Sequence, residues 1–429
     1  MQESLKQAKR VHIVGVGGIG ISALARLLRH QGKEVSGCDR TASDLGEALA
    51  REGISVSLGH AAEHVSPDTD LLIYSDAIPS GNPERLKAEE LGIPALSYFE
   101  ALGEATEGYD LIAVAGTHGK TTTTALLADI LEEAKLDPTV VVGSLRTKTR
   151  TNFRPGESRY FLVEADEYMR HFLHLSPKVL VITNIDRDHL DYYKDLADIQ
   201  SAFRALAEKV PADGYIVASA ADRHILPVLG NVKATVVDYT MVGEVPALKF
   251  PGKHNRANAR AALAAARVLG VADDVALPAL ASFEGTARRF EFKGETKAGT
   301  FVYDDYAHNP EKVRAALEGT RERFPDRRIV AVFQPHLYSR TRLLLPEFAG
   351  SFGDADEVIV LPIYAAREED DGTISSEKLA EEIGKQGRKV SPLSFEDAEG
   401  YLKSTLGPGD LLLTLGAGEA HKVGEALLL

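Results

Sequence analysis

The chain has 429 residues, of which 44% are hydrophobic, and its 49 basic against 63 acidic residues give a net charge of −14. This length favours two to four domains, each large enough for its own core, and the apolar content is that of a soluble globular protein. The acidic balance disfavours nonspecific binding to nucleic acid or to an anionic membrane surface. A protein of this charge that handles phosphates must do so through local positive groups and bound cations.

The cysteine content and the hydropathy of the chain exclude further classes of protein. Cys38 is the single cysteine, so an internal disulfide framework is excluded, and there is no C-x-x-C pair to suggest zinc. No apolar run approaches the roughly 18 residues of a membrane span, and the first residues do not begin a secretory signal. We therefore expect a cytoplasmic protein without membrane insertion.

The first motif lies near the N-terminus. Residues 11–14 are a short apolar run, followed at once by a G-x-G-x-x-G turn and a helical pattern at 21–30. Glycines in this strand–turn–helix setting allow a tight turn and the close approach of a diphosphate to the helix N-terminus. A second strand pattern at 34–37 leads to Asp39, which either meets a ribose hydroxyl or is a surface turn residue. The predicted substrate contacts are Gly15, Gly17, Gly18, Gly20 and Asp39.

The second motif is a glycine-bearing turn between the apolar run 111–115 and a helix that we expect to start near Lys120. Small residues let backbone N–H groups close on phosphates, a lysine reaches the β/γ-phosphates, and a threonine hydroxyl can bind magnesium. The general pattern G-x-x-x-x-G-K-[ST] has a leading glycine where this chain has Val114, which indicates a narrower family than ATP-binding proteins at large. The predicted phosphate contacts are Gly116, Thr117, His118, Gly119, Lys120, Thr121 and Thr122.

Acidic residues and a histidine follow two later apolar runs. One run ends at Glu164, with Asp166 and Glu167 close behind, and another, 179–182, opens into an acidic loop that contains His189. An acid at the carboxyl edge of a strand beside a phosphate loop is where a magnesium ligand belongs. His189 is either a solvated surface residue or a ligand of a metal or phosphate.

The C-terminal part again alternates strand and helix patterns, which indicates an α/β sheet. Polar residues, among them Asp305, His336 and Arg340, follow the strand patterns, at the edge where ligands of open α/β sheets gather. We predict an α/β protein of three domains: an N-terminal Rossmann-like domain, a central P-loop ATPase-like sheet and a C-terminal Rossmann-like domain. The predicted boundaries are 1–107, 108–292 and 293–429.

With these motifs the chain resembles the Mur ligases, the ATP-dependent amide-forming enzymes of peptidoglycan assembly. The phosphate loop matches that of the family, and residues 183–189 match its T-N-x-x-x-D-H segment. Residues 252–258 resemble its G-x-H-N-x-x-N motif, and residues 283–290 match its F-x-G-x-x-R-R-F hinge. The N-terminal glycine motif and residues 333–341 are similar to those of the alanine-adding branch.

The resemblance implies an ATP-dependent ligase that joins L-alanine to the carboxylate of UDP-N-acetylmuramate through an acyl phosphate. Its implied cofactors are ATP and Mg²⁺, its implied partners are the two small substrates, and we expect a monomer or a weak homodimer. In the central domain the resemblance implies that Lys120 holds the β/γ-phosphates, that Thr121 and Glu164 hold one magnesium ion, and that His189 holds a second.

For the remaining positions the resemblance implies contacts on the nucleoside and amino-acid sides. Asn255 is expected to face adenine, Asp305 the ribose and Arg289 the phosphates. His336 and Arg340 are candidates for the alanine carboxylate and the acyl phosphate, because a guanidinium binds a carboxylate in a bidentate manner. Three alternatives stay open: Arg289 as a surface ion-pair partner, Asp305 as a helix cap and His336 as a packing residue.

Three departures from the family pattern stand out. An arginine common in the family near the end of the first domain is missing, and residues 97–100 stand in its place. The branch often reads E-A-D-E-S-D-x-S-F, where this chain has a tyrosine, methionine, arginine and histidine at 168–171. The stretch 195–208 has no lysine, so we do not predict the carbamylated lysine of several sister ligases.

Three other functions stay open. The chain could be a nicotinamide dehydrogenase built on the first glycine motif, or the recycling ligase that attaches whole peptides to UDP-N-acetylmuramate. It could also be a non-catalytic UDP-sugar-binding module that has kept the fold.

Overall fold

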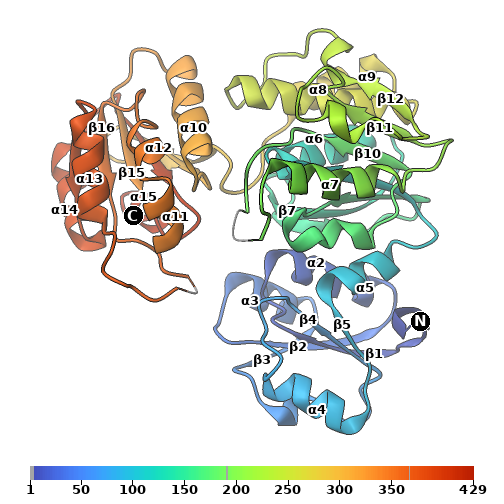
Figure 1. Ribbon diagram of the computed structural model, residues 1–429. Helices are drawn as coiled ribbons and strands as arrows, with labels where there is room; N and C mark the ends of the chain where they lie inside the picture. Colours follow the sequence, from blue (N-terminus) through green and yellow to red (C-terminus); the bar gives the residue numbers. More distant parts are fainter. Residues whose placement is uncertain (1–3, 190–191, 367) are drawn as a thin grey trace. The chain divides into compact units, whose positions relative to one another are not determined.

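The computed structural model describes residues 4–189, 192–366 and 368–429, whose helices and strands form three α/β domains, each around its own sheet (Figure 1). By their contacts the first two domains form one compact unit, residues 1–247 with 257–284, and the third forms another, residues 248–256 with 285–429. None of the described helices has both the length and the hydropathy needed to cross a bilayer.

The N-terminal domain is a five-stranded parallel sheet in the order β3-β2-β1-β4-β5. The strand order reverses direction at β1, so the turn after β1 opens at the switch point where such sheets bind nucleotides. The elements are α1 (Ser4–Gln7), β1 (Arg10–Val14), α2 (Ile19–His30), β2 (Glu34–Asp39), α3 (Asp44–Arg51), β3 (Ser55–Leu58), η1 (Ala62–His64), β4 (Leu71–Tyr74), α4 (Pro83–Leu91), β5 (Ala95–Ser97) and α5 (Tyr98–Ala105).

The central domain is a seven-stranded sheet in the order β12-β11-β10-β6-β9-β7-β8, in which only β8 runs antiparallel to its neighbour. Its inner strands are mostly apolar in their middle residues, as expected for a sheet with helices on both faces. The elements are β6 (Asp110–Ala115), α6 (Lys120–Glu133), β7 (Thr139–Arg146), β8 (Thr151–Arg154), β9 (Tyr160–Glu164), η2 (Tyr168–His174), β10 (Val179–Ile182), α7 (Leu196–Ala207), β11 (Tyr215–Ala218), η3 (Leu226–Val228), β12 (Thr235–Asp238), η4 (Tyr239–Met241), α8 (Lys253–Val268) and α9 (Asp273–Ser282).

The first two domains share one hydrophobic core, which runs from α2 to the strands of the central sheet. Helix α2 packs on the β7–β8 hairpin, and a buried polar link fixes the contact. Asn152 on β8 accepts a hydrogen bond from Arg26 at 2.6 Å and donates one to the Ser22 hydroxyl at 2.9 Å. Because these groups are buried, each needs its partner, and the link sets one orientation of the packing.

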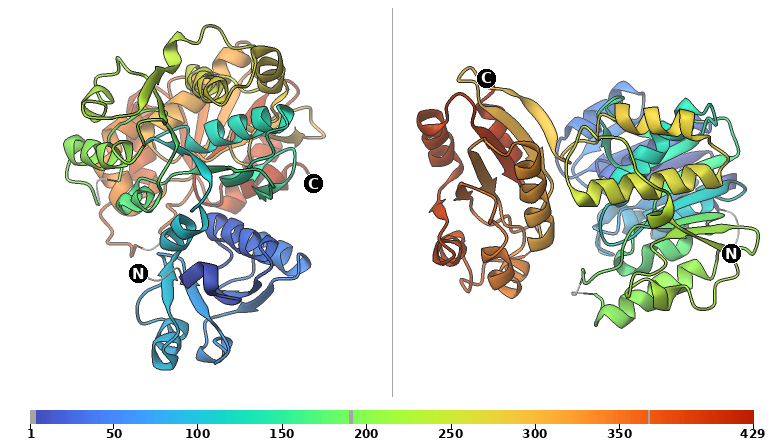
Figure 2. Two further views of the ribbon diagram at one scale, coloured as in Figure 1. Left: turned by 90° about the vertical axis from the view of Figure 1, so that its right-hand side faces the viewer. Right: turned by 90° about the horizontal axis from the view of Figure 1, so that it is seen from above.

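The C-terminal domain is a six-stranded sheet in the order β13-β14-β18-β15-β16-β17, with β13 antiparallel at one edge. Alternate residues of a strand enter different cores: Ala331 of β15 lies in one cluster and Val332 in the other, as the twofold side-chain period of a strand requires. Helices therefore cover both faces of the sheet (Figure 2). The elements are β13 (Glu291–Glu295), β14 (Phe301–Asp305), α10 (Pro310–Arg323), β15 (Ile329–Phe333), α11 (Tyr338–Leu343), α12 (Leu345–Ala349), β16 (Glu357–Val360), α13 (Ser376–Lys385), β17 (Lys389–Pro392), α14 (Phe395–Thr405), β18 (Leu411–Leu415) and α15 (His421–Ala426).

Candidate active site

The phosphate loop joins β6 to α6, and α6 begins at Lys120 as the sequence predicts. Gly119, the residue before the helix, has φ +83°, a left-handed conformation that favours glycine. A Cβ atom here would lie 2.2 Å from Oδ1 of Asn258 on α8, so the loop also needs glycine for space. No side chain caps the first turn of α6, whose backbone N–H groups form the positive end of the helix.

The T-N pair after β10 holds this loop in place. Asn184 accepts a hydrogen bond from the backbone N–H of His118 at 2.9 Å and donates its amide to the carbonyl of His118 at 2.8 Å. The Thr183 hydroxyl donates to the same carbonyl at 2.6 Å. The Thr117 hydroxyl accepts from the backbone N–H of Asp186 at 2.9 Å. The adjacent strands β6 and β10 thus fix the loop from one side.

Lys120 turns back across the loop. Its Nζ atom donates to the Gly116 carbonyl at 2.7 Å and to Oε2 of Glu167 at 2.6 Å. Burial by itself lowers the pKa of Lys120, but the carboxylates of Glu167 and Asp166 more than offset it and the pKa is raised. The lysine is therefore charged and lies across the loop between Gly116 and Glu167.

Carboxylates and a histidine meet at the carboxyl edge of the central sheet. The Thr121 hydroxyl donates to Oε1 of Glu164 at 2.9 Å. Ligand atoms of Asp166, Glu167 and His189 lie within 4.8 Å of one another, and Nε2 of His189 is 3.6 Å from Oε1 of Glu167. The structure therefore places Thr121 beside Glu164 and groups His189 with the next two acids.

Glu167 is the residue that sequence reasoning passed over. Its side chain is almost fully buried, and burial raises its pKa to about 7 even though the Lys120 charge acts in the opposite direction. The sequence signal for Glu167 is that three acidic residues, Glu164, Asp166 and Glu167, fall within four positions. Of these, only Glu164 stands at the end of β9.

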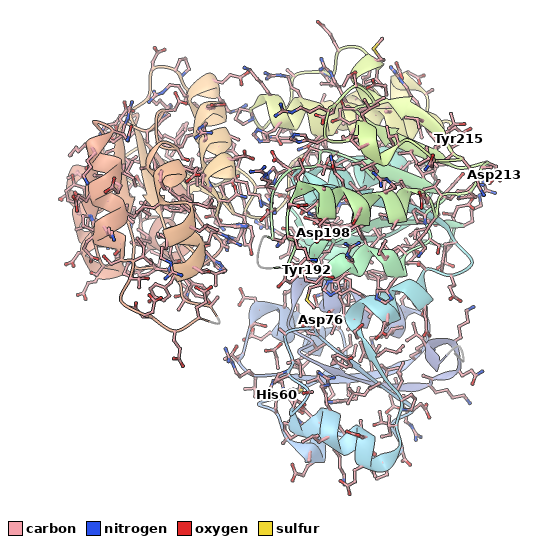
Figure 3. All side chains as sticks on the ribbon, in the orientation of Figure 1. His60, Asp76, Tyr192, Asp198, Asp213 and Tyr215 are labelled. Carbon is pink, nitrogen blue, oxygen red and sulfur yellow. The ribbon has the colours of Figure 1, made fainter. Side chains whose placement is uncertain are left out.

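The unusual segment 168–171 adopts a kinked 3-10 turn, η2, in which Met169 and Arg170 have φ values of 49° and 62°. Arg170 thereby reaches Asp198 on α7 at 2.6 Å. His171 stacks on Phe99 of α5 with ring centroids 3.8 Å apart and lies 3.9 Å from Asp76 of the N-terminal domain. Asp76 and Asp198 are labelled in Figure 3. The segment thus joins the two domains of the first unit beside the phosphate loop.

The N-terminal glycine turn follows β1. Gly15 and Val16 donate their N–H groups to the Cys38 carbonyl, and Asp39 accepts from the N–H of Gly17 at 2.9 Å. Gly18 precedes the first residue of α2 as its N-cap. Asp39 therefore touches the glycine turn and stabilises it.

Gly20 lies in the first turn of α2, where the close packing of Tyr98 leaves no space for a side chain. A Cβ atom at this position would lie 2.7 Å from the hydroxyl of Tyr98. Burial raises the pKa of Tyr98, with further contributions from Glu164, Asp166 and Asp76, so the phenol is neutral. Tyr98 lies where the sequence lacks the arginine common in relatives, between the glycine turn and the central acids.

In the C-terminal domain, Asp305 ends β14. It accepts hydrogen bonds from the N–H groups of Phe290 at 2.8 Å and Ala307 at 2.9 Å. Asn309, not Asp305, caps the following helix α10, so the helix-cap alternative for Asp305 is wrong. Burial raises the pKa of Asp305 to about 6, against the opposing charge of Arg289.

The neighbouring arginines differ in their partners. Arg288 donates to Asp304 at 2.9 Å and to the Gly416 carbonyl at 2.6 Å, which holds the turn after β18. Arg289 places its guanidinium carbon 5.1 Å from the ring centroid of Tyr306 and acts on Asp305 through its charge. Arg288 therefore stabilises the fold, whereas the charge of Arg289 acts on the carboxylate of Asp305.

His336 follows β15 and stacks on Tyr364 with ring centroids 5.5 Å apart, and the His308 ring lies 6.2 Å away. Arg340 lies in the short helix α11, half-exposed. Asn255 is buried at the start of α8 and donates its amide to the Pro251 carbonyl at 2.6 Å. These residues lie at strand and helix ends of the second unit.

Three family models match consecutive parts of the chain: the Mur ligase family catalytic domain at residues 10–110, the Mur ligase middle domain at 114–245 and the Mur ligase glutamate ligase domain at 288–418. The chain belongs to the Mur ligase family. Members of this family are ATP-dependent ligases that form amide bonds, so the predicted family, enzyme class and three-domain α/β fold are confirmed.

Curated relatives and solved structures agree with this assignment. The UDP-N-acetylmuramate–L-alanine ligase of Clostridium kluyveri is 41% identical over 98% of both chains, and that of Caldanaerobacter subterraneus is 41% identical over 100% of this chain and 99% of its own. The UDP-N-acetylmuramate-alanine ligase of Thermotoga maritima has a TM-score of 0.82 at 28% identity over 97% of this chain and 98% of its own. A murein peptide ligase from Psychrobacter arcticus has a TM-score of 0.73 at 25% identity over 98% of both chains.

Proposed function

We propose that this Mur ligase joins L-alanine to the carboxylate of UDP-N-acetylmuramate, with ATP as the activating reagent, in the cytoplasmic synthesis of peptidoglycan precursors. The observation that carries the proposal is the junction of Lys120, the Thr121–Glu164 pair and the Asp166–Glu167–His189 group at one sheet edge. The alanine ligases that match this chain over its whole length at 41% identity support the choice of substrates.

The chemistry needs such a site because a carboxylate oxygen is a poor leaving group. Phosphoryl transfer from ATP to the UDP-N-acetylmuramate carboxylate forms an acyl phosphate, and ADP leaves. The amine of L-alanine then attacks the carbonyl carbon, and inorganic phosphate leaves as the amide forms. Because the reacting oxygens are anionic throughout, catalysis depends on positioning and on charge neutralisation.

The central residues fit magnesium by the chemistry of their donors. Hydroxyl and carboxylate oxygens are ligands that Mg²⁺ prefers, and Thr121 with Glu164 offers them beside the loop. Asp166, Glu167 and His189 offer a second donor set. An ion bound at either position would neutralise phosphate charge. Lys120 and the N–H groups at the start of α6 would bind the β/γ-phosphates directly.

The remaining roles follow from charge and position. The turn of Gly15, Gly17 and Gly18 would take the UDP diphosphate. Asn255 would face adenine, ionised Asp305 would accept from ribose hydroxyls, and Arg289 would meet phosphate oxygens. His336 and Arg340 would bind the L-alanine carboxylate and the acyl phosphate.

A coupled assay of phosphate release tests the proposal. Release should require UDP-N-acetylmuramate and L-alanine together, and mass spectrometry should find the amide product. Phosphate release that needs neither substrate contradicts the proposal, as does turnover with NAD and no ATP. Substrate-dependent binding without any turnover would indicate the non-catalytic UDP-sugar module.

The peptide-attaching ligase remains the second candidate, because a solved structure of that class is also similar to this chain. A panel of L-alanine, glycine, L-serine and the murein tripeptide separates the two. We expect turnover with L-alanine and not with the tripeptide. A missing methyl group costs only about 1–3 kcal/mol of discrimination, so glycine should react at a reduced rate.

A further inference from the structure

The N-terminal domain contains a cluster of metal-binding side chains that the ligase reaction does not use. His12 lies in the middle of β1, Cys38 near the end of β2 and Glu84 in the first turn of α4. His60 and His64 come from the segment that follows β3; His60 is labelled in Figure 3, where it lies over α4. His12, Cys38 and Glu84 are each at most 2% exposed.

The distances in this cluster suit a small tetrahedral ion. Ligand atoms of His12, Cys38 and Glu84 lie within 4.8 Å of one another. Nδ1 of His60 lies 3.0 Å from Oε2 of Glu84 and 3.3 Å from Sγ of Cys38. Ligands that bind tetrahedral zinc at about 2.0–2.3 Å lie roughly 3.3–3.8 Å apart, so the contacts of His60 with Cys38 and Glu84 are already close to the spacing of a coordination shell.

A second observation concerns His12 alone. Its Nδ1 atom is hydrogen-bonded to the Ser36 hydroxyl at 2.9 Å, while Nε2 is buried and has no hydrogen-bond partner among the described residues. Ligating histidines characteristically bind the metal through one ring nitrogen and fix the ring through the other. Leaving a buried ring nitrogen unsatisfied costs about 1–3 kcal/mol, which a bound cation would remove.

The carboxylate at the centre of the cluster also favours a cation. Among the described residues, Glu84 forms ion pairs only with His60 and His64 and has no lysine or arginine partner.

We propose that His12, Cys38, His60 and Glu84 bind one zinc ion, with His64 holding the second carboxylate oxygen of Glu84. Thiolate, imidazole and carboxylate together are a zinc donor set, and four protein ligands close the shell as in structural sites. Zinc binding releases the thiol proton of Cys38. His64 Nδ1 lies 2.8 Å from Oε1 of Glu84, which is the position of an orienting partner.

The ion would tie β1, β2 and α4 together directly behind the glycine turn. The Cys38 carbonyl accepts the N–H groups of Gly15 and Val16 at 2.9 and 3.0 Å. The sequence motif C-x-x-C is missing, so the sequence alone does not indicate this zinc site. Its ligands are spread over 73 positions, from residue 12 to residue 84, and only the sheet topology brings them together.

Metal analysis of the purified full chain tests the proposal without reference to ligase activity. After growth with zinc and removal of loose metal, we expect about one zinc per chain. Replacement by Co²⁺ should give a thiolate-to-cobalt charge-transfer band in the near ultraviolet. A folded wild-type chain that holds no zinc and gives no such band with Co²⁺ overturns the proposal and leaves a metal-free hydrogen-bond network centred on Glu84.

Variants localise the ion. Cys38→Ser should abolish the charge-transfer band, and His12→Gln should lower the zinc content at least about tenfold, because each removes one ligand. His30→Gln, which changes a half-exposed histidine in the same domain, should leave both unchanged. His189→Ala should also keep the band, which separates this site from the central acidic group. Full zinc content in both Cys38→Ser and His12→Gln would mean adventitious binding elsewhere and would overturn the proposal.

Discussion

Nζ of Lys120 lies 2.6 Å from Oε2 of Glu167, so the phosphate-loop lysine and a carboxylate at the edge of the central sheet form a nearly buried ion pair. The pair keeps the lysine charged. It also means that the positive charge of Lys120 is shared with the carboxyl group of Glu167, so the magnesium proposed above would supply the remaining neutralisation of phosphate charge.

We expect Lys120→Met to lower the rate of phosphate release by about 10²- to 10³-fold, because one preorganised charge contact to the transition state is lost. Stability should fall less than for an ordinary buried pair, since Glu167, whose pKa is already about 7, can take up a proton. Steady-state kinetics and denaturant unfolding measure the two effects. The double variant Lys120→Met/Glu167→Gln should be as inactive as the single one; recovery of activity would contradict this role for Lys120.

Asn184→Ala should reduce kcat/KM about 10- to 100-fold. It removes the two hydrogen bonds that Asn184 makes with His118 and so loosens the phosphate loop, and small misplacements of a binding group lower the rate strongly. The matched control is Asp195→Ala, which removes an exposed helix cap on α7 in the same domain. The interpretation fails if the two variants show the same kcat/KM.

Arg146 on β7 is 2% exposed and pairs with Asp129 and Glu132 of α6, the helix that carries the phosphate loop. We expect Arg146→Met to lower the free energy of unfolding by about 3–5 kcal/mol, since it leaves the buried carboxylate of Asp129 without its arginine partner. Arg159→Met, which breaks an exposed pair with Asp110, should cost at most about 1 kcal/mol. Denaturant titrations at neutral pH compare the two, and equal losses would contradict the assignment.

Met169 has φ +49° in the kinked turn η2 and is exposed. A β-branched side chain is strained in this conformation, so Met169→Val should cost about 1–2 kcal/mol of stability, whereas Met169→Gly should cost nothing or stabilise. Met241→Val, at another exposed methionine without a positive φ, is the control and should change stability by less than about 0.5 kcal/mol. Thermal unfolding distinguishes these outcomes.

Asp305 predicts a pH dependence of stability. Its pKa of about 6 lies above the ordinary value of 3.8, so between these pH values the folded chain binds a proton that the unfolded chain does not. The contribution of this group to the free energy of unfolding therefore rises as the pH falls through that window and is lowest above pH 6.

Lowering the pH should therefore stabilise wild type relative to Asp305→Asn, as measured by the difference between their free energies of unfolding. Asp326→Asn, which removes one exposed negative charge, is the matched control. If Asp305 accepts ribose hydroxyls only when ionised, ATP affinity should weaken over the same pH range. A flat difference between wild type and Asp305→Asn would contradict the raised pKa.

Much of this arrangement was predictable because it depends on local sequence. Short apolar runs that end in glycines predict strand–turn–helix units, and the start of α6 at Lys120 follows directly. The antiparallel strands β8 and β13 are different, since strand direction depends on pairing across the sheet rather than on residue pattern. The partners of His189 were equally hidden, because they depend on how η2 folds back after β9.

Tertiary contacts also decide the roles of the two neighbouring arginines and the position of the helix cap. Arg288 and Arg289 are equivalent in sequence, and only the position of the turn after β18 decides which of them is committed to backbone carbonyls. Asp305 and Asn309 are both good N-cap residues, and α10 begins after the second. Local propensity left both choices open, and tertiary contacts resolved them.

The single hydrophobic core shared by the first two domains has a consequence for substrate selection. Because α2 packs on the β7–β8 hairpin through Asn152, the glycine turn at one end of α2 and the phosphate loop belong to one compact unit. If these two turns bind the diphosphate and the reacting end of the UDP substrate as proposed, this unit sets the distance between them. We then expect analogues with a shorter or longer spacer between diphosphate and carboxylate to bind more weakly than the substrate itself.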